Sequence, residues 1–354
     1  MPRAAPLSRR LVLCVLAALL TAGASIRAGS QRATNPRFPA ALEKYLSESV
    51  KLTPLERSTL FSNAPVSKLL DGDPAKEVSI FGAVWIDAPA SAYVALVRDI
   101  ENFERGGAFH VTRRISDPPK LSDFDAMTLP DEDVADLKNC RVGDCELKLS
   151  QDSLDRVRKS LDWSKPTIKR DADALARQVA FDFVRGYVEG GNDRLGVYRD
   201  RERPTFVAAE FRTLIDRVPA LVEFLPDFKS YLLGYPKAVL PNASSFLYWQ
   251  EAQFGLKPTI RVNHLVIQER PDSVAIANKM IYASHYFWTA LELRVLVPDP
   301  ARGRGFWFVN VNRSRSDGLS GFVGRIIRGR VQSEAQRGIA TALSATRAAL
   351  ERNR

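Results

Sequence analysis

The side chains best suited to chemistry gather in the C-terminal half of the chain, in segments rich in aromatic residues. Histidine can act as a general base near neutral pH, and a tyrosine hydroxyl can donate a hydrogen bond to a ligand. These residues could hold the polar end of a ligand, catalyse its conversion, or simply be sheet side chains hydrogen-bonded to nearby backbone. The candidate ligand-binding residues are Tyr248, Glu251, His264, Tyr282, His285 and Tyr286.

Other kinds of catalytic and metal sites lack their usual sequence signals. The chain has only three histidines (His110, His264 and His285), and no two stand at the spacing of a zinc-binding helix. It contains no Gly-x-Ser-x-Gly motif, and no glycine-rich phosphate loop with its lysine. We therefore expect no metal ion and no cofactor, and catalytic residues stay unassigned.

Five strand-like runs follow one another at 245–254, 259–268, 273–283, 288–297 and 305–312, mostly separated by Pro, Gly and Asp. This spacing predicts an antiparallel meander. Residues 319–352 predict one long amphipathic helix that covers it. The buried side of that helix would hold Phe322, Val323, Ile326, Ile327, Val331, Ile339, Leu343 and Leu350.

The first part of the chain mixes both kinds of pattern. Residues 77–86 and 109–115 predict strands on either side of a helix that begins after Pro89, and 145–149 predicts a short strand. Residues 50–70 have helical spacing, and residues 151–235 predict several helices broken by glycine and proline.

Residues 1–24 have the order of a cleavable signal peptide. Arg3, Arg9 and Arg10 precede the apolar run Leu11–Leu20, and Ala22-Gly23-Ala24 supplies the small residues of a cleavage site. The apolar run is too short for a membrane span, which needs roughly 20 residues. We therefore expect a periplasmic or secreted protein; Arg9-Arg10 leaves both the general and the twin-arginine export routes open.

The two cysteines outside the signal peptide predict a local disulfide. Cys140 and Cys145 are separated by four residues that include a Gly-Asp turn. In an oxidising compartment such a pair favours a structural disulfide over a redox or metal pair.

The chain of 354 residues has a formal charge of +10, and removal of residues 1–24 would lower it to +7. Arginines are densest near the C-terminus. Arg325, Arg328 and Arg330 could contact an anionic membrane surface, although a solvated helix face is the simpler explanation. Nucleic acid is not an expected partner, because no nucleic-acid motif accompanies an export signal.

The order of the predicted elements resembles the START-like, or helix-grip, superfamily of polyketide cyclases and lipid-transfer proteins. Two stretches carry the resemblance: residues 84–103, with the Ala88-Pro89 turn and Asp99-Ile100 at the helix end, and residues 245–352. The family fold implies an α+β domain in which a curved antiparallel sheet wraps around a long C-terminal helix. That domain would span 71–354, interrupted by a helical insertion at about 151–240, after a leader and helical segment at 25–70.

The resemblance also implies a function. We expect an exported protein that binds or transfers a lipid or isoprenoid-like ligand in a hydrophobic cavity under the C-terminal helix. A cyclase- or dehydratase-type enzyme that uses the same cavity, although less favoured, and an envelope protein-interaction module are the alternatives. A fold alone does not choose among them.

Overall fold

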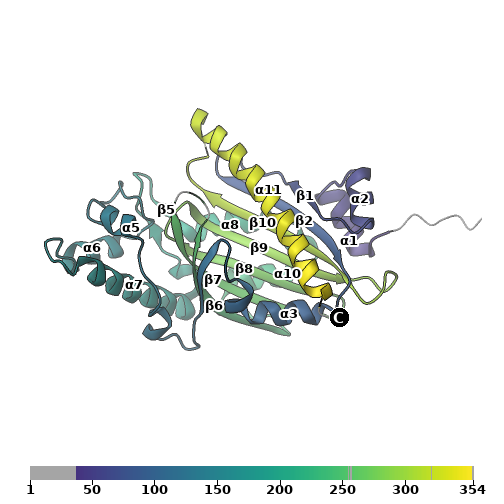
Figure 1. Ribbon diagram of the computed structural model, residues 1–354, viewed down its shortest axis with the longest axis horizontal. Helices are drawn as coiled ribbons and strands as arrows, with labels where there is room; N and C mark the ends of the chain where they lie inside the picture. The colour runs from purple at the N-terminus through teal and green to yellow at the C-terminus, as the bar shows by residue number, and fades with distance from the viewer. Residues whose placement is uncertain (1–36, 254, 256, 320, 353–354) are drawn as a thin grey trace, which may run out of the picture. The chain divides into compact units, whose positions relative to one another are not determined.

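The computed structural model describes residues 37–253, 255, 257–319 and 321–352. The predicted signal peptide lies outside the described residues. The described part is an α+β fold built on one eight-stranded antiparallel sheet with helices on both faces (Figure 1). Among the described residues, no helix is long and apolar enough to cross a membrane.

The large sheet has the strand order β1-β2-β10-β9-β8-β7-β6-β3, so the strands after residue 240 form a continuous meander. A two-stranded sheet pairs β4 (Val197–Tyr198) with β5 (Thr205–Phe206). The strands of the large sheet are β1 (Val66–Leu69), β2 (Glu77–Ile86), β3 (Phe109–Arg114), β6 (Ala243–Gln253), β7 (Pro258–Glu269), β8 (Val274–Ala283), β9 (Phe287–Pro298) and β10 (Phe306–Ser316).

The helices vary from single turns to the 32 residues of the last one. They are α1 (Ala40–Lys44), α2 (Pro54–Phe61), α3 (Ala90–Arg98), α4 (Ile100–Phe103), α5 (Asp131–Leu137), α6 (Gln151–Ser160), α7 (Ile168–Gly190), α8 (Val207–Ile215), α9 (Pro219–Glu223), α10 (Pro226–Gly234) and α11 (Gly321–Arg352). A π-helix (Tyr45–Ser49) and two 3-10 helices (Leu121–Phe124 and Gly191–Arg194) complete the set.

Both faces of the sheet are buried, which explains why β2 is apolar almost throughout. Phe81 and Trp85 of β2 pack in a core with α1, α2 and α8–α10. Val84 and Ile86 point to the opposite face, where they pack with α3, α4 and α11. Figure 1 shows α11 crossing one face of the sheet and α8 behind the other.

The helical block α5–α7 packs on the β6–β8 end of the sheet. Trp249, Val262 and Ile281 from these strands share a core with Leu154 of α6 and Val184 of α7. The predicted insertion at about 151–240 is divided in the structure: α6 and α7 belong to this block, whereas α8–α10 pack in the core that contains α1 and α2. The block also encloses the apolar pocket described below.

The predicted meander, the strand at 77–86, the helix after Pro89 and the long last helix are confirmed. The predicted disulfide is present, with Cys140 and Cys145 sulfurs 2.07 Å apart. Two element predictions were wrong. Residues 66–69 form the edge strand β1, too short for a visible alternation, and residues 145–149 form no strand. The backbone there forms isolated hydrogen bonds with Arg199, Asp200 and Ser284, not a ladder.

The packing of α11 differs between its two halves. Ile339 and Leu343 lie directly over Gly82, where a Cβ would come within 2.4 Å and 2.9 Å of their methyl groups, so this crossing requires glycine. The predicted buried side is wrong at Ile326, Ile327 and Val331, which are 61%, 46% and 39% exposed. The side chains of Phe322 and Val323 lie outside the description. The first turns of α11 extend past the sheet, so no strand lies beneath these residues (Figure 1).

Candidate functional site

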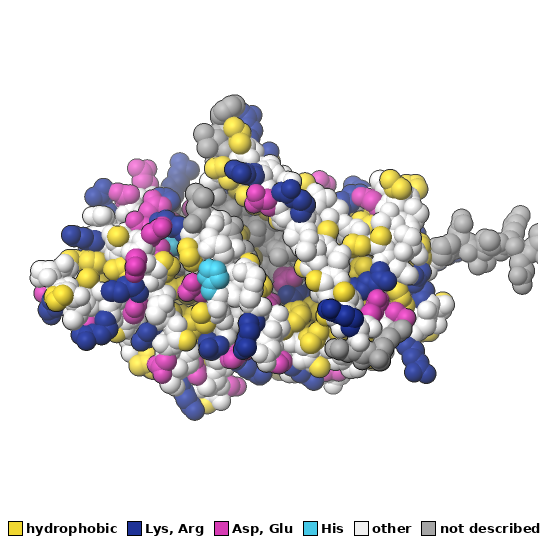
Figure 2. Space-filling model, viewed as in Figure 1, with side chains coloured by type: hydrophobic (Ala, Val, Ile, Leu, Met, Phe, Trp, Pro, Cys, Tyr) yellow, Lys and Arg dark blue, Asp and Glu magenta, His cyan; other side chains and the backbone are white. Residues whose placement is uncertain are grey.

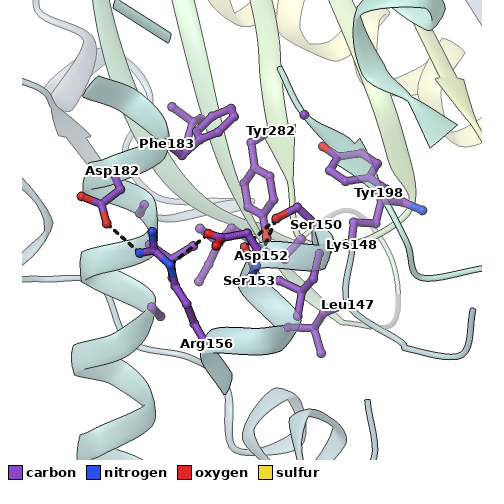
Figure 3. Close-up of a pocket in the computed structure, with 18 of the residues that line it drawn as sticks. Leu147, Lys148, Ser150, Asp152, Ser153, Arg156, Asp182, Phe183, Tyr198 and Tyr282 are labelled. Carbon is purple, nitrogen blue, oxygen red and sulfur yellow. Dashed lines mark hydrogen bonds and ion pairs between the residues drawn. The ribbon is translucent and has the colours of Figure 1, made fainter. Parts of the chain in front are cut away.

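A largely apolar pocket of about 490 Å³ lies between the helical block and the sheet (Figure 3). Its volume falls in the range of small-molecule sites. Its walls come from α5, α6 and α7, from the segments around residues 127–129, 147–150 and 193–198, and from β7 and β8. None of the described residues that line it belongs to α11. The pocket is therefore not the expected cavity under the C-terminal helix.

Small side chains on α7 leave room for the pocket. Ala172, Ala176 and Ala180 recur every four residues and all line it. On a helix, residues four apart share a face, so these alanines present a shallow surface to the cavity. Phe183, one turn further on, closes this wall with its ring.

The sheet supplies the opposite wall. Ile260 and Val262 of β7 and Tyr282 of β8 line the pocket. The Tyr282 ring lies 5.9 Å from the Phe183 ring and 6.3 Å from the Tyr198 ring. Burial raises the pKa of the Tyr282 hydroxyl above its ordinary value, so this phenol stays protonated at neutral pH. Tyr282 can therefore offer a hydrogen bond in an apolar setting.

An ion-pair bridge stands at the solvent-facing end of the pocket. The Arg156 guanidinium of α6 lies 2.9 Å from the Asp152 carboxylate and 2.7 Å from the Asp182 carboxylate of α7. The hydrogen bond with Asp182 raises the pKa of Arg156 above its ordinary value. Asp152 is 75% exposed and Arg156 37%, so the bridge faces water and can rearrange at small cost.

Lys148 forms a second polar feature in the pocket wall. Its ammonium lies 3.1 Å from Asp200 and 2.9 Å from Asp317, and its side chain is only 3% exposed. Two carboxylates thus neutralise this cation. The other charged side chains in the lining are Asp152, Arg156, Asp182, Asp193 and Arg194. The rest of the lining is mainly apolar, which suits an apolar body with one hydroxyl or similar head.

The sequence-predicted ligand residues do not form one site. Tyr282 alone among them lines the apolar pocket. His285 is buried, with Nε2 at 3.0 Å and 3.1 Å from the Asp133 carboxylate oxygens and Nδ1 at 3.1 Å from the Glu146 carbonyl. It joins the β8–β9 turn to α5. Tyr286, with φ of 63°, sits in that turn and accepts a hydrogen bond from the Lys257 amide.

Glu251 lies on the sheet face that carries the helical block, but it does not line the apolar pocket. Its carboxylate is 3.1 Å from Nδ1 of His110 on the neighbouring strand β3. Tyr248 points to the α11 face, where its hydroxyl accepts a hydrogen bond of 2.6 Å from Asn278 and donates to Glu104.

The α11 face of the sheet holds a buried polar network around Glu104, Glu292 and Arg294. Asn310 and Arg294 both donate to the Glu292 carboxylate. Three buried atoms of this network have no hydrogen-bond partner among the described residues: Arg294 Nη1, Asn278 Oδ1 and Asn310 Oδ1. The middle of this face is therefore polar, in contrast to the apolar cavity that the resemblance implied.

His264 belongs to a separate buried chain of polar groups. Its Nδ1 lies 2.9 Å from the Tyr187 hydroxyl, to which Nζ of Lys279 donates at 3.2 Å. Lys279 also donates to Asn192. Burial lowers the pKa of Lys279 well below its ordinary value, and burial together with Lys279 lowers the pKa of His264 to about 3. His264 lines a second, more polar pocket with Tyr235, Arg114 and Asp117.

Sequence reasoning missed most residues of the apolar pocket, because they lie in the helical block. The signal that could have found them is the run of alanines at four-residue spacing, since small residues on a buried helix face leave volume. The predicted membrane residues Arg325, Arg328 and Arg330 lie on the first turns of α11, away from both pockets.

No group of three or more His, Cys, Asp or Glu side chains that could hold a metal ion is found among the described residues. No protein family model, curated protein or solved structure matches the chain. The helix-grip resemblance therefore stays a prediction, and function has to be argued from the site.

Proposed function

We propose that this chain is an exported protein that binds or carries one hydrophobic molecule in the pocket between α6, α7 and the sheet. The observation that supports this proposal is the largely apolar lining of a space of about 490 Å³ beside a bridge of charged side chains. Sites of this kind bury an apolar body and orient it with a few polar groups.

The side chains in the pocket wall indicate the class of ligand that it can bind. Alanine, leucine, valine and phenylalanine side chains suit an aliphatic or isoprenoid-like body. Tyr282 can donate one hydrogen bond, and Lys148 is already neutralised by Asp200 and Asp317. An amphiphile with a single small polar head fits these groups better than a sugar or a nucleotide. The Arg156 bridge would have to open for entry, or leave the head outside.

The first test is native mass spectrometry, with organic extraction, of protein purified from its own host. We expect a stoichiometric adduct that partitions into organic solvent. The protein mass in the same spectrum also identifies the N-terminal residue. A mass that corresponds to a chain beginning at Ser25 would support export. Recovery of fully folded protein without an extractable ligand would count against the proposal.

The second test fills the pocket. Ala180→Trp places an indole in the cavity, so it should weaken binding of the apolar fluorophore N-phenyl-1-naphthylamine at least about tenfold, equal to about 1.4 kcal/mol. Ala174→Trp is the matched control, because Ala174 lies on the same helix but is exposed. Equal probe affinity in both variants, with unchanged circular dichroism, would place the probe outside this pocket.

The location and the fold family remain parts of the proposal. The helix-grip assignment is supported by the antiparallel meander and the C-terminal helix packed on the sheet. The disulfide is typical of an oxidising compartment and so agrees with export.

A further inference from the structure

Three aliphatic side chains stand exposed together on the first turns of α11. Ile326, Ile327 and Val331 are 61%, 46% and 39% exposed, and they fall within six consecutive residues. Elsewhere the large exposed apolar side chains of the described residues are scattered along the chain. Figure 2 shows apolar side chains among basic ones on this projecting end of α11. Exposed aliphatic residues that cluster in this way indicate a surface that contacts a partner.

The helix is oriented so that this cluster points away from the protein. Arg328, on the side of the helix that faces the body, donates a hydrogen bond to the Pro74 carbonyl. Ala335 and Ile339 then begin the contact with the body, next to Val78 and Ile80. The helix is therefore fixed to the body by Arg328 and by contacts that begin at Ala335.

The charge around the cluster is strongly positive. Residues 321–338 contain four arginines and one acid, Glu334. The Arg330 side chain is 83% exposed, and its guanidinium lies 3.7 Å from the Glu334 carboxylate. Because it is so exposed, it can extend outward from between the aliphatic side chains. An aliphatic strip with long basic side chains beside it is the composition of helices that lie in the surface of anionic bilayers.

We infer that the exposed face of α11 formed by Ile326, Ile327, Arg330 and Val331 docks the protein on an anionic lipid bilayer. The aliphatic side chains would enter the region between headgroups and acyl chains, and the arginines would contact lipid phosphates. Docking of a second copy on the same face is disfavoured, because pairing two such faces would bring like charges together. The inference does not depend on the ligand pocket, whose described lining includes no residue of α11.

The test is flotation of the mature full-length protein with vesicles. We expect binding to vesicles of equal amounts of phosphatidylglycerol and phosphatidylcholine, with much weaker binding to phosphatidylcholine alone. Ile326→Ser with Ile327→Ser should lower the affinity about tenfold or more, because it removes most of the buried aliphatic area. Arg330→Gln should cost several-fold, and less at high salt.

The matched control removes two exposed aliphatic residues from other surfaces. Leu55→Ser with Val239→Ser, at positions 77% and 87% exposed, should bind vesicles like the unaltered protein. N-phenyl-1-naphthylamine binding, measured on every variant, should stay unchanged, which separates this inference from the pocket proposal. Equal vesicle binding by the Ile326/Ile327 variant and the control would overturn the inference. So would a dimer in light scattering that this variant abolishes, since a second copy would then cover the face.

Discussion

Two buried lysines in this protein have opposite electrostatic surroundings. Lys148, in the wall of the apolar pocket, is 3% exposed and lies between the carboxylates of Asp200 and Asp317. Lys279, on β8, is fully buried, and no carboxylate of a described residue forms an ion pair with it. Its Nζ contacts the hydroxyl of Tyr187 and the amide of Asn192, and lies 4.2 Å from the centre of the Phe211 ring.

The difference shows how the same side chain can serve two purposes. A paired lysine keeps its charge inside the fold, because nearby carboxylates replace the lost hydration. A buried lysine without a carboxylate beside it has a lowered pKa, because burial disfavours the charged form. Perturbed groups of the second kind gather at functional sites, and here the chain Lys279–Tyr187–His264 ends at a second pocket. Three substitutions can break or sharpen this contrast.

Lys148→Met should have the largest effect. It leaves the buried Asp200 carboxylate with only a 3.9 Å contact to the half-exposed Arg201. Loss of one partner of a buried ion pair costs about 3–5 kcal/mol, so the free energy of unfolding in urea should fall by that amount. Lys169→Met breaks a more exposed pair with Asp173 and should cost at most about 1 kcal/mol. Similar losses in the two variants would contradict the assigned role of burial.

Lys279→Met should act in the opposite direction. Burial lowers the pKa of Lys279 in the folded protein well below its value in the unfolded chain, so the folded state is disfavoured at pH values below the unfolded pKa. Methionine has a similar shape and no such cost. We expect the free energy of unfolding to rise by about 1 kcal/mol or more, because each unit by which a pKa is lowered corresponds to about 1.4 kcal/mol. A clear loss of stability would mean that Lys279 is charged and paired.

His264→Gln should change how stability depends on pH. The folded pKa of about 3 lies below the unfolded value near 6.5, so the unfolded chain alone gains a proton as the pH falls. Stability should therefore be lost below about pH 6.5, by about 1–2 kcal/mol between pH 6.5 and 5. The glutamine variant should lose this slope, as measured by urea unfolding at several pH values. An unchanged slope would show that His264 is already protonated in the folded protein.

The secondary structure was readable from the sequence wherever a segment is long and meets the sheet in a regular way. The alternation and the turn residues after 241 placed all five strands of the meander, and β2 was located by its apolar, β-branched run. The short strand β1 carries only four residues, too few for a period to show. The segment 145–149 has the composition of a strand, but its disulfide and its single backbone contacts hold it in an irregular path.

The site was less predictable than the fold, because a pocket depends on which residues face each other across the core. Tyr282 was among the predicted residues, but its neighbours Phe183 and Ala180 come from a helix about a hundred residues earlier. Alternation alone could not tell which face of each strand points to which helices. Because both faces of the sheet are buried, the pattern of polar and apolar positions does not indicate which side chains face a given helix.

The sequence by itself determined the α+β class, the meander, the long last helix and the local disulfide, because these depend on short-range periodicity, turn chemistry and spacing. Only the tertiary structure decided where the cavity lies, which lysine is paired, and which part of α11 is covered. Apolar side chains occur along the whole of that helix, but its contacts with strands β1 and β2 begin near Ala335 and Gln336, beyond the exposed residues Ile326, Ile327 and Val331. Burial depends on what lies opposite a residue, and the sequence does not state that.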